Sequence, residues 1–445
     1  MSVLTASWNH RHRLGQTLSD AGRGVYNPHH TVVALAADGG YDLSALEAAW
    51  RGLQLRHPVL TGGFDLPSAR WTVPDRPEPT GPTVLPPPPA VCDGRPGGPV
   101  DEGALRALLT EAAAQPFDLE RGPLARLLVL PLTGSRVVFQ LTVEHLISDA
   151  WSLNTLLREL AVLYNAALKD DTPRLPPSAP AFTDFVSEQN QWLESTAGRA
   201  ALRALADRAG DLGPVPGTRI EGFSGRRTIR YEKRGSMVGR LDAALCQALA
   251  RRARASRLSR STLTHAALHH ALWRLSDGDR VATTLSTANR EAAGADRMVG
   301  WLSSKVVVAS EPGRAAGLDA FLAAFNAEVL TGYDLARVPW PRLIAELTPS
   351  ALGHHTTEPY VTFNAQTIGM RRLLGPVEFE NLATTTLPVS VGWHDASIAT
   401  FWNEDLDGTR VSLHWKTDWY GERSIQRLWD TIHDTLRAWA STAPN

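Results

Sequence analysis

The stretch Glu144-His145-Leu146-Ile147-Ser148-Asp149-Ala150 separates two segments with different hydrophobic periodicities. In residues 137–143 every second side chain is apolar, the period-two pattern of a β-strand. Residues 153–164 instead repeat leucine at the three- and four-residue spacing of an amphipathic α-helix. The sequence therefore predicts a strand, a turn and a helix, with His145 and Asp149 in the turn. An imidazole is suited to proton transfer near neutral pH, so the turn is a candidate catalytic site.

Further motifs follow one another along the chain in a recognisable order. They are Leu55-Arg56-His57-Pro58-Val59-Leu60, Pro116-Phe117-Asp118-Leu119-Glu120-Arg121-Gly122-Pro123-Leu124, Thr287-Ala288-Asn289-Arg290, Val299-Gly300-Trp301-Leu302-Ser303-Ser304, Val338-Pro339-Trp340-Pro341-Arg342-Leu343-Ile344, Val361-Thr362-Phe363-Asn364-Ala365-Gln366 and residues 411–429. Together with the turn, these segments resemble the condensation domains of nonribosomal peptide synthetases and their acyltransferase relatives. The family's signature is His-His-x-x-x-Asp-Gly, and here Glu144 replaces the first His and Ala150 replaces the Gly.

The resemblance covers nearly the whole chain and implies a fold. It predicts an α/β (α+β) protein of two chloramphenicol acetyltransferase-like lobes in a V-shaped pseudo-dimer with a channel between them. A chain of 445 residues is longer than one core usually supports, which also favours two lobes. Because residues 169–180 are rich in charges and prolines, we place the boundary there, with an N-terminal lobe over 1–178 that carries the turn and a C-terminal lobe over 179–445.

Outside the turn, periodicity and breaker residues predict alternating strands and helices. A strand is expected over residues 31–36, followed by a helix for which Ser44 and Glu47 fit a capping box. Residues 74–99 contain too much proline and glycine for a helix or central strand and are expected to form a surface loop. The other expected elements are a helix over 103–114, strands on both sides of 133–135, helices within 182–209 and 241–275, strands and a helix within 281–330, strands up to 419 and a helix over 424–439.

The resemblance assigns roles within the turn. His145 would be the catalytic base or an orienting hydrogen-bond partner, whereas a histidine at a strand end is otherwise often only structural. Asp149 would pair with Arg290 and brace the turn, although an acidic residue in a first helical turn also favours the helix dipole. Ser148 is expected to be the helix N-cap. In this mechanism the acceptor attacks the donor directly, so no serine nucleophile is needed.

The departures from the signature carry their own expectations. If strand alternation continues to its end, Glu144 points away from the face of Val143 and His145, and its substitution spares the reacting face. Ala150 adds a Cβ where the backbone of the family runs close to the acyl donor, and it would narrow the channel. By resemblance, the residues expected in the substrate channel are Trp301, Ser303 and Ser304, with Ser304 in a position where the family often has Asn.

Composition excludes several function classes. With 43% hydrophobic and 20% charged residues and a formal charge of −1, the chain has an ordinary globular composition and no electrostatic case for nucleic acid or an anionic membrane. No run approaches roughly 20 apolar residues and the N-terminus lacks the apolar stretch of a secretory signal, so we expect a cytoplasmic protein. Its two cysteines lack both a disulfide framework and a metal-ligand spacing.

The sequence lacks the motifs that other kinds of catalytic or cofactor site require. His265 and His269 are four residues apart, a spacing that can bind zinc, but the flanking metalloprotease pattern is missing and a helix face is the simpler interpretation. The adjacent pairs His29-His30 and His354-His355 would alternate faces in a strand and are not expected to share a metal. The chain shows no nucleophile elbow, phosphate-binding loop or dinucleotide fingerprint, so we expect no bound cofactor and no metal.

The leading hypothesis from the resemblance is a free-standing condensation enzyme. It would join a thioester-activated acyl or aminoacyl donor to an amine or hydroxyl acceptor and make an amide or an ester. The donor would be held on the phosphopantetheine arm of an acyl or peptidyl carrier protein, which must come in trans because the sequence contains no carrier segment. Two alternatives stay open: an acyl-CoA-dependent acyltransferase of the same fold, and a catalytically degenerate recruitment module suggested by Glu144 and Ala150.

Overall fold

The computed structural model describes residues 2–66, 68, 70–74, 76–92, 98–209, 218–224, 234–355, 359–365, 378–387, 389, 396–405 and 408–442. The chain forms two compact units. The first unit comprises Met1–Asn190, Arg290–Leu302 and Leu373–Trp393, and the second comprises Gln191–Asn289, Ser303–Arg372 and His394–Asn445. This division differs from a single boundary between residues 178 and 179, because two later segments return to the first unit. The V-shaped arrangement and its channel stay predictions.

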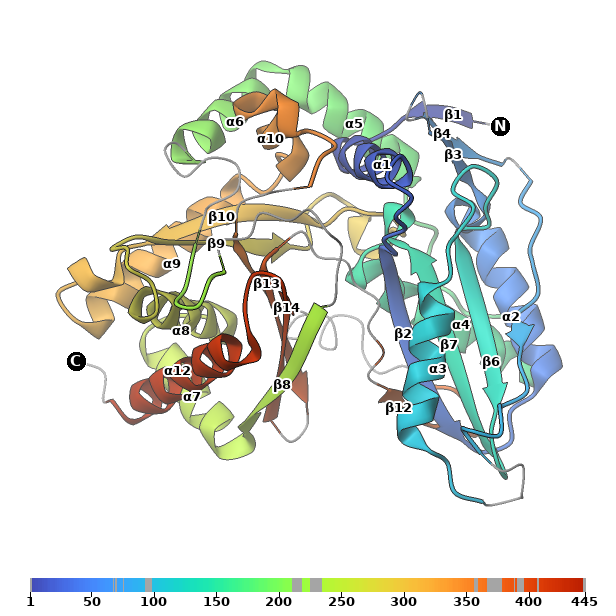
Figure 1. The fold of residues 1–445 in the computed structure, drawn as a ribbon. Coiled ribbons are helices and arrows are strands. Elements are labelled where there is room, and N and C mark those ends of the chain that lie inside the picture. Colours follow the sequence, from blue (N-terminus) through green and yellow to red (C-terminus); the bar gives the residue numbers. More distant parts are fainter. Residues whose placement is uncertain are drawn as a thin grey trace. The chain divides into compact units, whose positions relative to one another are not determined.

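The first unit is built on a five-stranded sheet in the order β12-β2-β7-β6-β5 (Figure 1). Its strands are β2 (His30–Asp38), β5 (Thr83–Val84), β6 (Ala125–Pro131), β7 (Arg136–Glu144) and β12 (Ala383–Leu387). The long strands β2 and β7 pair antiparallel, which places His30 opposite Glu144 at the end of the ladder. The late segment that returns to this unit supplies β12, which pairs along β2 and so explains why one boundary cannot divide the chain.

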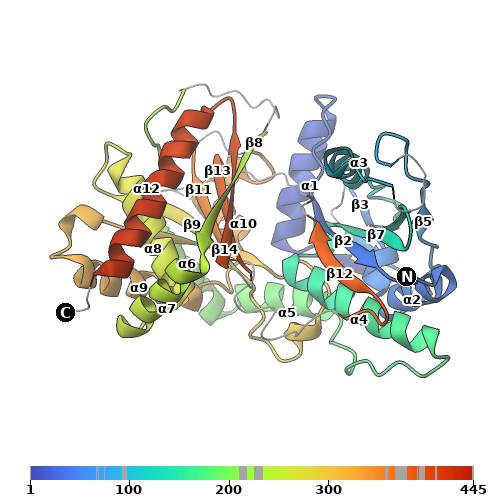
Figure 2. The ribbon, with the colours of Figure 1, turned by 90° about the horizontal axis from the view of Figure 1, so that it is seen from below.

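Helices cover both faces of this sheet, as the strand alternation of β7 requires. One face carries α2 (Leu43–Arg56) and α4 (Ala150–Leu168), and the other carries α3 (Glu102–Ala114) (Figures 1 and 2). Val137, Phe139, Leu141 and Val143 are buried in the same cluster as the leucines of α2 and α4. The opposite face of β7 contributes Val138 to a smaller cluster with α3. The predicted strand and helix on either side of the turn are therefore confirmed.

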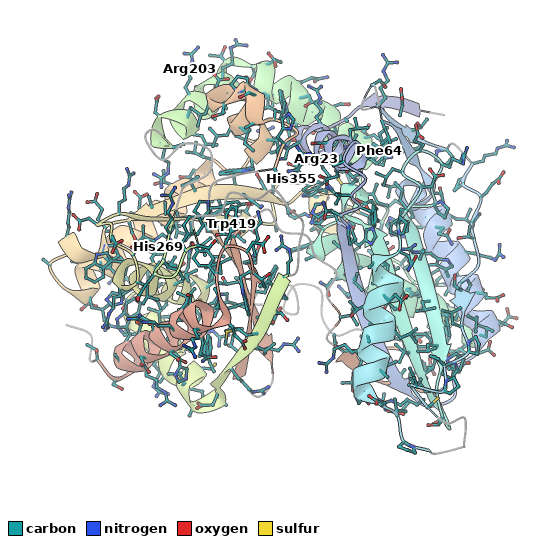
Figure 3. All side chains as sticks on the ribbon, viewed as in Figure 1. Arg23, Phe64, Arg203, His269, His355 and Trp419 are labelled. Atoms are coloured by element: carbon teal, nitrogen blue, oxygen red, sulfur yellow. The ribbon has the colours of Figure 1, made fainter. Side chains whose placement is uncertain are left out.

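Smaller elements complete the first unit. They are the helix α1 (Trp8–Ala21) and a three-stranded sheet of β1 (Ser2–Thr5), β4 (Arg70–Val73) and β3 (Gly63–Asp65) (Figure 1). Phe64 is 1% exposed and belongs to the large core cluster (Figure 3). The proline-rich segment 74–99 supplies only the short strand β5 at the sheet edge, while residues 75 and 93–97 lie outside the described part of the chain.

The predicted capping box of α2 is wrong. The N-cap is Asp42, whose carboxylate accepts a hydrogen bond of 2.8 Å from the Ala45 backbone N–H. Ser44 and Glu47 lie inside the helix, which begins at Leu43. An aspartate is as effective an N-cap as a serine, so the pattern around Ser44 misplaced the start by only a short distance.

The second unit contains a six-stranded sheet in the order β10-β9-β11-β13-β14-β8. The strands are β8 (Arg234–Asp242), β9 (Val281–Thr287), β10 (Ser304–Ser310), β11 (Val361–Ala365), β13 (Ile398–Asp405) and β14 (Gly408–Lys416). The helices are α5 (Phe182–Glu194), which begins in the first unit, and α6 (Thr196–Ala209), α7 (Ala243–Ala255), α8 (Arg260–Arg274), α9 (Leu318–Asp334), α10 (Trp340–Leu347) and α12 (Glu422–Ser441). Gln366, the last residue of one quoted motif, lies outside the described residues.

Two histidines of the second unit, His265 and His269, lie in its core and contact other core residues. His269 on α8 is fully buried, and His265 one turn earlier stacks on Phe363 at a ring distance of 4.3 Å (Figure 3). The Nε2 atoms of both rings lie 2.7 to 2.8 Å from the Thr283 hydroxyl. Within the described residues, no group of three or more metal-ligating side chains gathers here or elsewhere. A membrane-spanning helix is absent from the same described part, because none of its helices combines enough length with a sufficiently apolar sequence.

The burial of these histidines predicts that the free energy of unfolding falls as the pH is lowered. Burial lowers the pKa of His269 to about 3 and holds the pKa of His265 well below its usual value, with the neighbouring imidazole as a second cause. Since the unfolded chain binds these protons near pH 6.5, the stability that they contribute is complete above that pH and falls on acidification. Each such group should cost about 1.4 kcal/mol of unfolding free energy per pH unit below 6.5.

Urea denaturation at pH 7.0, 6.0 and 5.0 measures this dependence. His269→Leu should flatten the fall in unfolding free energy, whereas the exposed His354→Leu should leave the slope unchanged. A slope that is identical in His269→Leu and the parent chain would contradict the prediction.

Candidate active site

The quoted stretch forms a tight connection between β7 and α4. After Glu144 the chain makes one 3₁₀ turn over His145–Ile147, and α4 begins at Ala150. Leu146 and Ile147 are fully buried in the core of the first unit, so the turn cannot move without disrupting packing. The His145 backbone N–H donates to the His29 carbonyl at 2.9 Å, which extends the pairing of β2 and β7 into the turn.

A second histidine holds the turn from α1. His10 is fully buried, and its Nε2–H donates to the Leu146 carbonyl at 2.7 Å while its Nδ1 accepts from the Ser7 backbone N–H. Burial lowers the pKa of His10 to about 4, although the hydrogen bond to the carbonyl acts in the opposite direction. The ring is therefore neutral at physiological pH. His10 could not be identified from the sequence, because no local pattern relates α1 to a turn 136 residues later.

The prediction for Ser148 is corrected by the structure. The N-cap of α4 is Asp149, which has extended backbone dihedrals and accepts a 2.9 Å hydrogen bond from the Ser152 backbone N–H. Ser148 is fully buried, and its hydroxyl lies within hydrogen-bonding distance of the Glu144 carbonyl and the Thr31 hydroxyl. Ser148 therefore ties the turn to β2 rather than capping the helix.

Asp149 and Arg290 form a buried ion pair within the first unit. Arg290 Nη2 donates to Asp149 Oδ1 at 2.6 Å, and the two side chains are only 4% and 3% exposed. Arg290 Nη1 donates to the carbonyls of Ala295 and Met298, which fixes the returning segment 290–302. The carboxylate also accepts from the Leu302 backbone N–H at 3.1 Å. The pairing suggested by resemblance is thus present, and it fastens two distant parts of the chain.

Ser152 and Gly300 complete the bracing network. The Ser152 hydroxyl lies 2.8 Å from Asp149 Oδ1 and accepts the Gly300 backbone N–H at 3.1 Å. Gly300 is needed because a Cβ at this position would lie 2.3 Å from the ring of Phe182. Burial raises the pKa of Asp149, but the Arg290 charge and the hydrogen bonds from Ser152 and Arg290 outweigh it and lower the pKa below its usual value. Asp149 is accordingly ionised throughout the physiological range.

The His145 ring lies against two other rings. It stacks on His29 with a centroid distance of 4.3 Å and an interplanar angle of 18°, and the Trp301 ring lies 4.5 Å away. Trp301 also contacts His29 edge-on at 5.5 Å, so the three rings form one cluster in the first unit. Of the expected channel residues, Trp301 therefore meets His145 directly, and its contact with substrate stays a prediction.

Glu144 points to the other side of the strand, as predicted from strand phase. Its carboxylate Oε2 lies 3.2 Å from His30 Nε2, and both side chains are almost completely buried. The adjacent histidines thus alternate faces as a strand requires, with His29 on the side of His145 and His30 on the side of Glu144. From the sequence, the pair His29-His30 was expected only not to share a metal ion. Its alternation, set beside that of residues 144 and 145, could have identified both contacts.

Three further residues were expected at the site, namely Ala150, Ser303 and Ser304. Ala150 is the first residue of α4, and its effect on a donor channel stays a prediction. Ser304 begins β10 in the second unit, where it is buried and its hydroxyl lies 3.5 Å from the Val338 carbonyl. Ser303 also belongs to the second unit. The proposed role of both serines in substrate contact stays a prediction.

Comparisons with known proteins agree on one family. Residues 99–444 match the model of the condensation domain. The chain is 25% identical over 407 residues to chondramide synthase cmdD of Chondromyces crocatus, an alignment that covers 88% of this chain but 10% of that protein. Thus the chain spans only about a tenth of the length of this curated relative.

Solved structures share the fold at low sequence identity. The X-domain in its complex with OxyB from teicoplanin biosynthesis has a TM-score of 0.79 and 20% identity, with 99% of this chain and 94% of that chain covered. The first condensation domain of the calcium-dependent antibiotic synthetase, in complex with a substrate analogue, has a TM-score of 0.78 and 16% identity, with 99% and 97% covered. The predicted mixed α/β fold class is confirmed.

Proposed function

The chain belongs to the condensation domain family, and we propose that it is an acyltransferase that joins a thioester-activated acyl or aminoacyl donor to an amine or hydroxyl acceptor. The single observation that carries this proposal is the position of His145. It is retained in the turn of a family signature whose Asp149 is locked to Arg290 at 2.6 Å. A turn braced in this way holds an imidazole in one orientation, which general-base catalysis requires.

The chemistry needs one proton acceptor and no covalent enzyme intermediate. The nitrogen or oxygen of the acceptor attacks the thioester carbonyl, and its proton passes to His145. The tetrahedral intermediate then collapses with cleavage of the carbon–sulfur bond, and the departing thiolate takes up the proton. His29, stacked on His145, restricts rotation of the ring, while Trp301 shields it on another side. His145, Asp149 and Arg290 account for positioning and proton transfer without a serine nucleophile.

The donor in this proposal is carried by the phosphopantetheine arm of an acyl or peptidyl carrier protein. The relatives support a carrier partner because they are nonribosomal peptide synthetases such as linear gramicidin synthase. We further propose that the carrier acts in trans on a free-standing cytoplasmic enzyme, with CoA as the alternative donor arm. The acceptor is a small molecule or a second carrier-bound group, and the product is an amide or an ester.

A second candidate function is recruitment without catalysis. Glu144 and Ala150 depart from the signature, and the X-domain of the same fold forms a complex with OxyB. Against recruitment stands the bracing of His145 by long-range contacts from His10, Asp149 and Arg290, which a docking surface does not need. We therefore rank acyl transfer first.

An assay with matched donors tests the proposal. The full chain is incubated with acyl groups on a carrier protein, the same groups on CoA and a panel of amines and alcohols, and products are identified by mass spectrometry. Acyl transfer predicts enzyme-dependent product from at least one donor, with the carrier donor preferred. Absence of product from every donor, together with saturable binding of a protein partner, would favour recruitment.

A further inference from the structure

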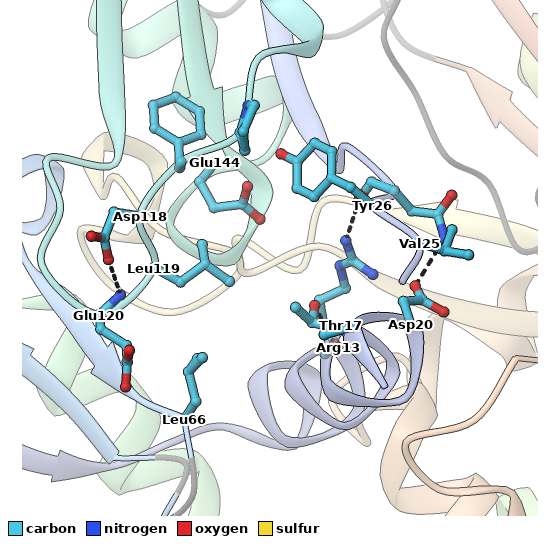
Figure 4. Close-up of a pocket in the computed structure, with 14 residues that line it drawn as sticks. Arg13, Thr17, Asp20, Val25, Tyr26, Leu66, Asp118, Leu119, Glu120 and Glu144 are labelled. Atoms are coloured by element: carbon cyan, nitrogen blue, oxygen red, sulfur yellow. Dashed lines mark hydrogen bonds between the residues drawn. The ribbon is translucent and has the colours of Figure 1, made fainter. Parts of the chain in front are cut away.

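A cavity in the first unit lies on the Glu144 side of the sheet, away from the His145 ring cluster. It has a volume of about 300 Å³ and lies between the C-terminal half of α1, residues 25–27 and residues 116–120 (Figure 4). This volume is at the lower limit of ligand-binding pockets, about 300 to 1,000 Å³, so it suits a small molecule and not a peptide. Three buried charged side chains, those of Arg13, Asp20 and Glu144, line it.

Arg13 lines this cavity, and two of its buried hydrogen-bond donors are unused by the described residues. The residue is 5% exposed, and its Nη2 donates to the Asn27 carbonyl at 2.8 Å. Among the described residues, Nε and Nη1 are buried and have no hydrogen-bond partner. A buried guanidinium with two unpaired N–H groups is costly unless an oxygen acceptor binds there.

Glu144 presents the opposite charge. It is 4% exposed and its Oε2 meets His30 Nε2, but no described residue hydrogen-bonds to its Oε1. Arg13 and Glu144 both line the cavity, yet no ion pair joins them within the described part of the chain. The cavity therefore lies between Arg13, whose Nε and Nη1 lack an acceptor, and Glu144, whose Oε1 lacks a donor, among the residues that the structure describes.

Two other carboxylates at the cavity, those of Asp20 and Asp118, are already engaged. Asp20 accepts the Asn27 side-chain N–H at 2.8 Å, and Asp118 accepts the backbone N–H groups of Glu120 and Arg121. These partners satisfy Asp20 and Asp118 locally, and Glu120 is exposed to solvent. Arg13 and Glu144 are thus the buried pair of opposite charge left for a ligand.

We infer that this cavity binds a free α-amino acid with an apolar side chain. Its carboxylate accepts hydrogen bonds from Arg13 and its ammonium group donates to Glu144. Leu66, Phe117 and Leu119 supply apolar wall for the side chain. A zwitterion has no net charge, so its two ends pair with Arg13 and Glu144 and leave the net charge of the cavity unchanged. A simple anion would be repelled by Glu144 and a simple amine by Arg13. This inference does not depend on the proposed acyl transfer.

Calorimetric titration of the full chain with matched ligands tests the inference. L-phenylalanine has both charged groups, 3-phenylpropionate lacks the ammonium and 2-phenylethylamine lacks the carboxylate. We expect saturable binding of phenylalanine and at least about tenfold weaker binding of each analogue. Absence of saturable binding by both phenylalanine and leucine, or equal binding of the three aromatic ligands, overturns the inference.

Variants assign the binding to this cavity. Arg13→Met should abolish phenylalanine binding, and Glu144→Gln should remove the preference for phenylalanine over 3-phenylpropionate. Arg23→Met, at an exposed arginine just beyond the end of α1, is the matched control and should bind normally (Figure 3). Ala21→Phe fills the cavity from an exposed position and leaves the buried charges intact, so it decides the matter if Arg13→Met does not fold. Normal binding by Ala21→Phe overturns the inference.

Discussion

His145→Ala is expected to lower the rate of product formation about 10²- to 10⁴-fold without loss of the folded state, because that is the usual contribution of a general base. The imidazole belongs to a half-buried cluster with His29 and Trp301, whereas the fully buried Leu146 and Ile147 anchor the turn in the core. Removing the ring should therefore affect kcat far more than the free energy of unfolding.

The measurement compares kcat and KM of His145→Ala with the parent chain, using the donor and acceptor found to be active. His433→Ala, on α12 in the second unit, is the control for loss of a histidine elsewhere and should retain full activity. Circular dichroism melting curves check that each variant is folded. Unchanged turnover in His145→Ala would remove this residue from the mechanism and leave the acyl-transfer proposal without its base.

Much of the local structure around the turn could be predicted because strand and helix periods are local properties. The alternation of β7 correctly placed Glu144 opposite Val143, and leucine spacing correctly predicted α4. Local chemistry was less decisive between neighbouring polar residues. Ser148 and Asp149 are both good N-caps, and only the folded turn, in which the Asp149 carboxylate accepts the Ser152 backbone N–H, shows that Asp149 caps the helix.

Long-range contacts could not be predicted from patterns of this kind. The hydrogen bond from His10 to Leu146 and the contact between His30 Nε2 and the Glu144 carboxylate join residues more than 100 positions apart. The same holds for β12, a short strand that follows the second unit's β11 in sequence but pairs with β2 of the first. Periodicity contains no information about which distant edge a strand will join, so a single domain boundary was the simplest prediction.

Arg290→Met is expected to lower the free energy of unfolding by about 3–5 kcal/mol, since it leaves the buried Asp149 carboxylate without its cation. Arg290 is 4% exposed and also donates to two carbonyls of segment 290–302, so its loss removes hydrogen bonds as well as charge. The matched control is Arg297→Met in the same segment. Arg297 pairs with Asp296 at 3.5 Å in an exposed position, where an ion pair contributes about 0–1 kcal/mol.

Urea denaturation followed by tryptophan fluorescence measures both losses at pH 7. The double variant Asp149→Asn/Arg290→Met should be more stable than Arg290→Met alone, because it no longer buries an unpaired charge. The pKa of Asp149 is lowered in the folded state, so the stability that the pair contributes is present above the unfolded pKa of about 3.9 and is lost as pH falls through the folded value. In Arg290→Met, burial without the cation raises the pKa of Asp149, so the gap in unfolding free energy between the variant and the parent chain should be largest at pH 7 and narrow on acidification, as protonation removes the unpaired charge. Equal losses in Arg290→Met and Arg297→Met would mean that the bridge does not stabilise the turn.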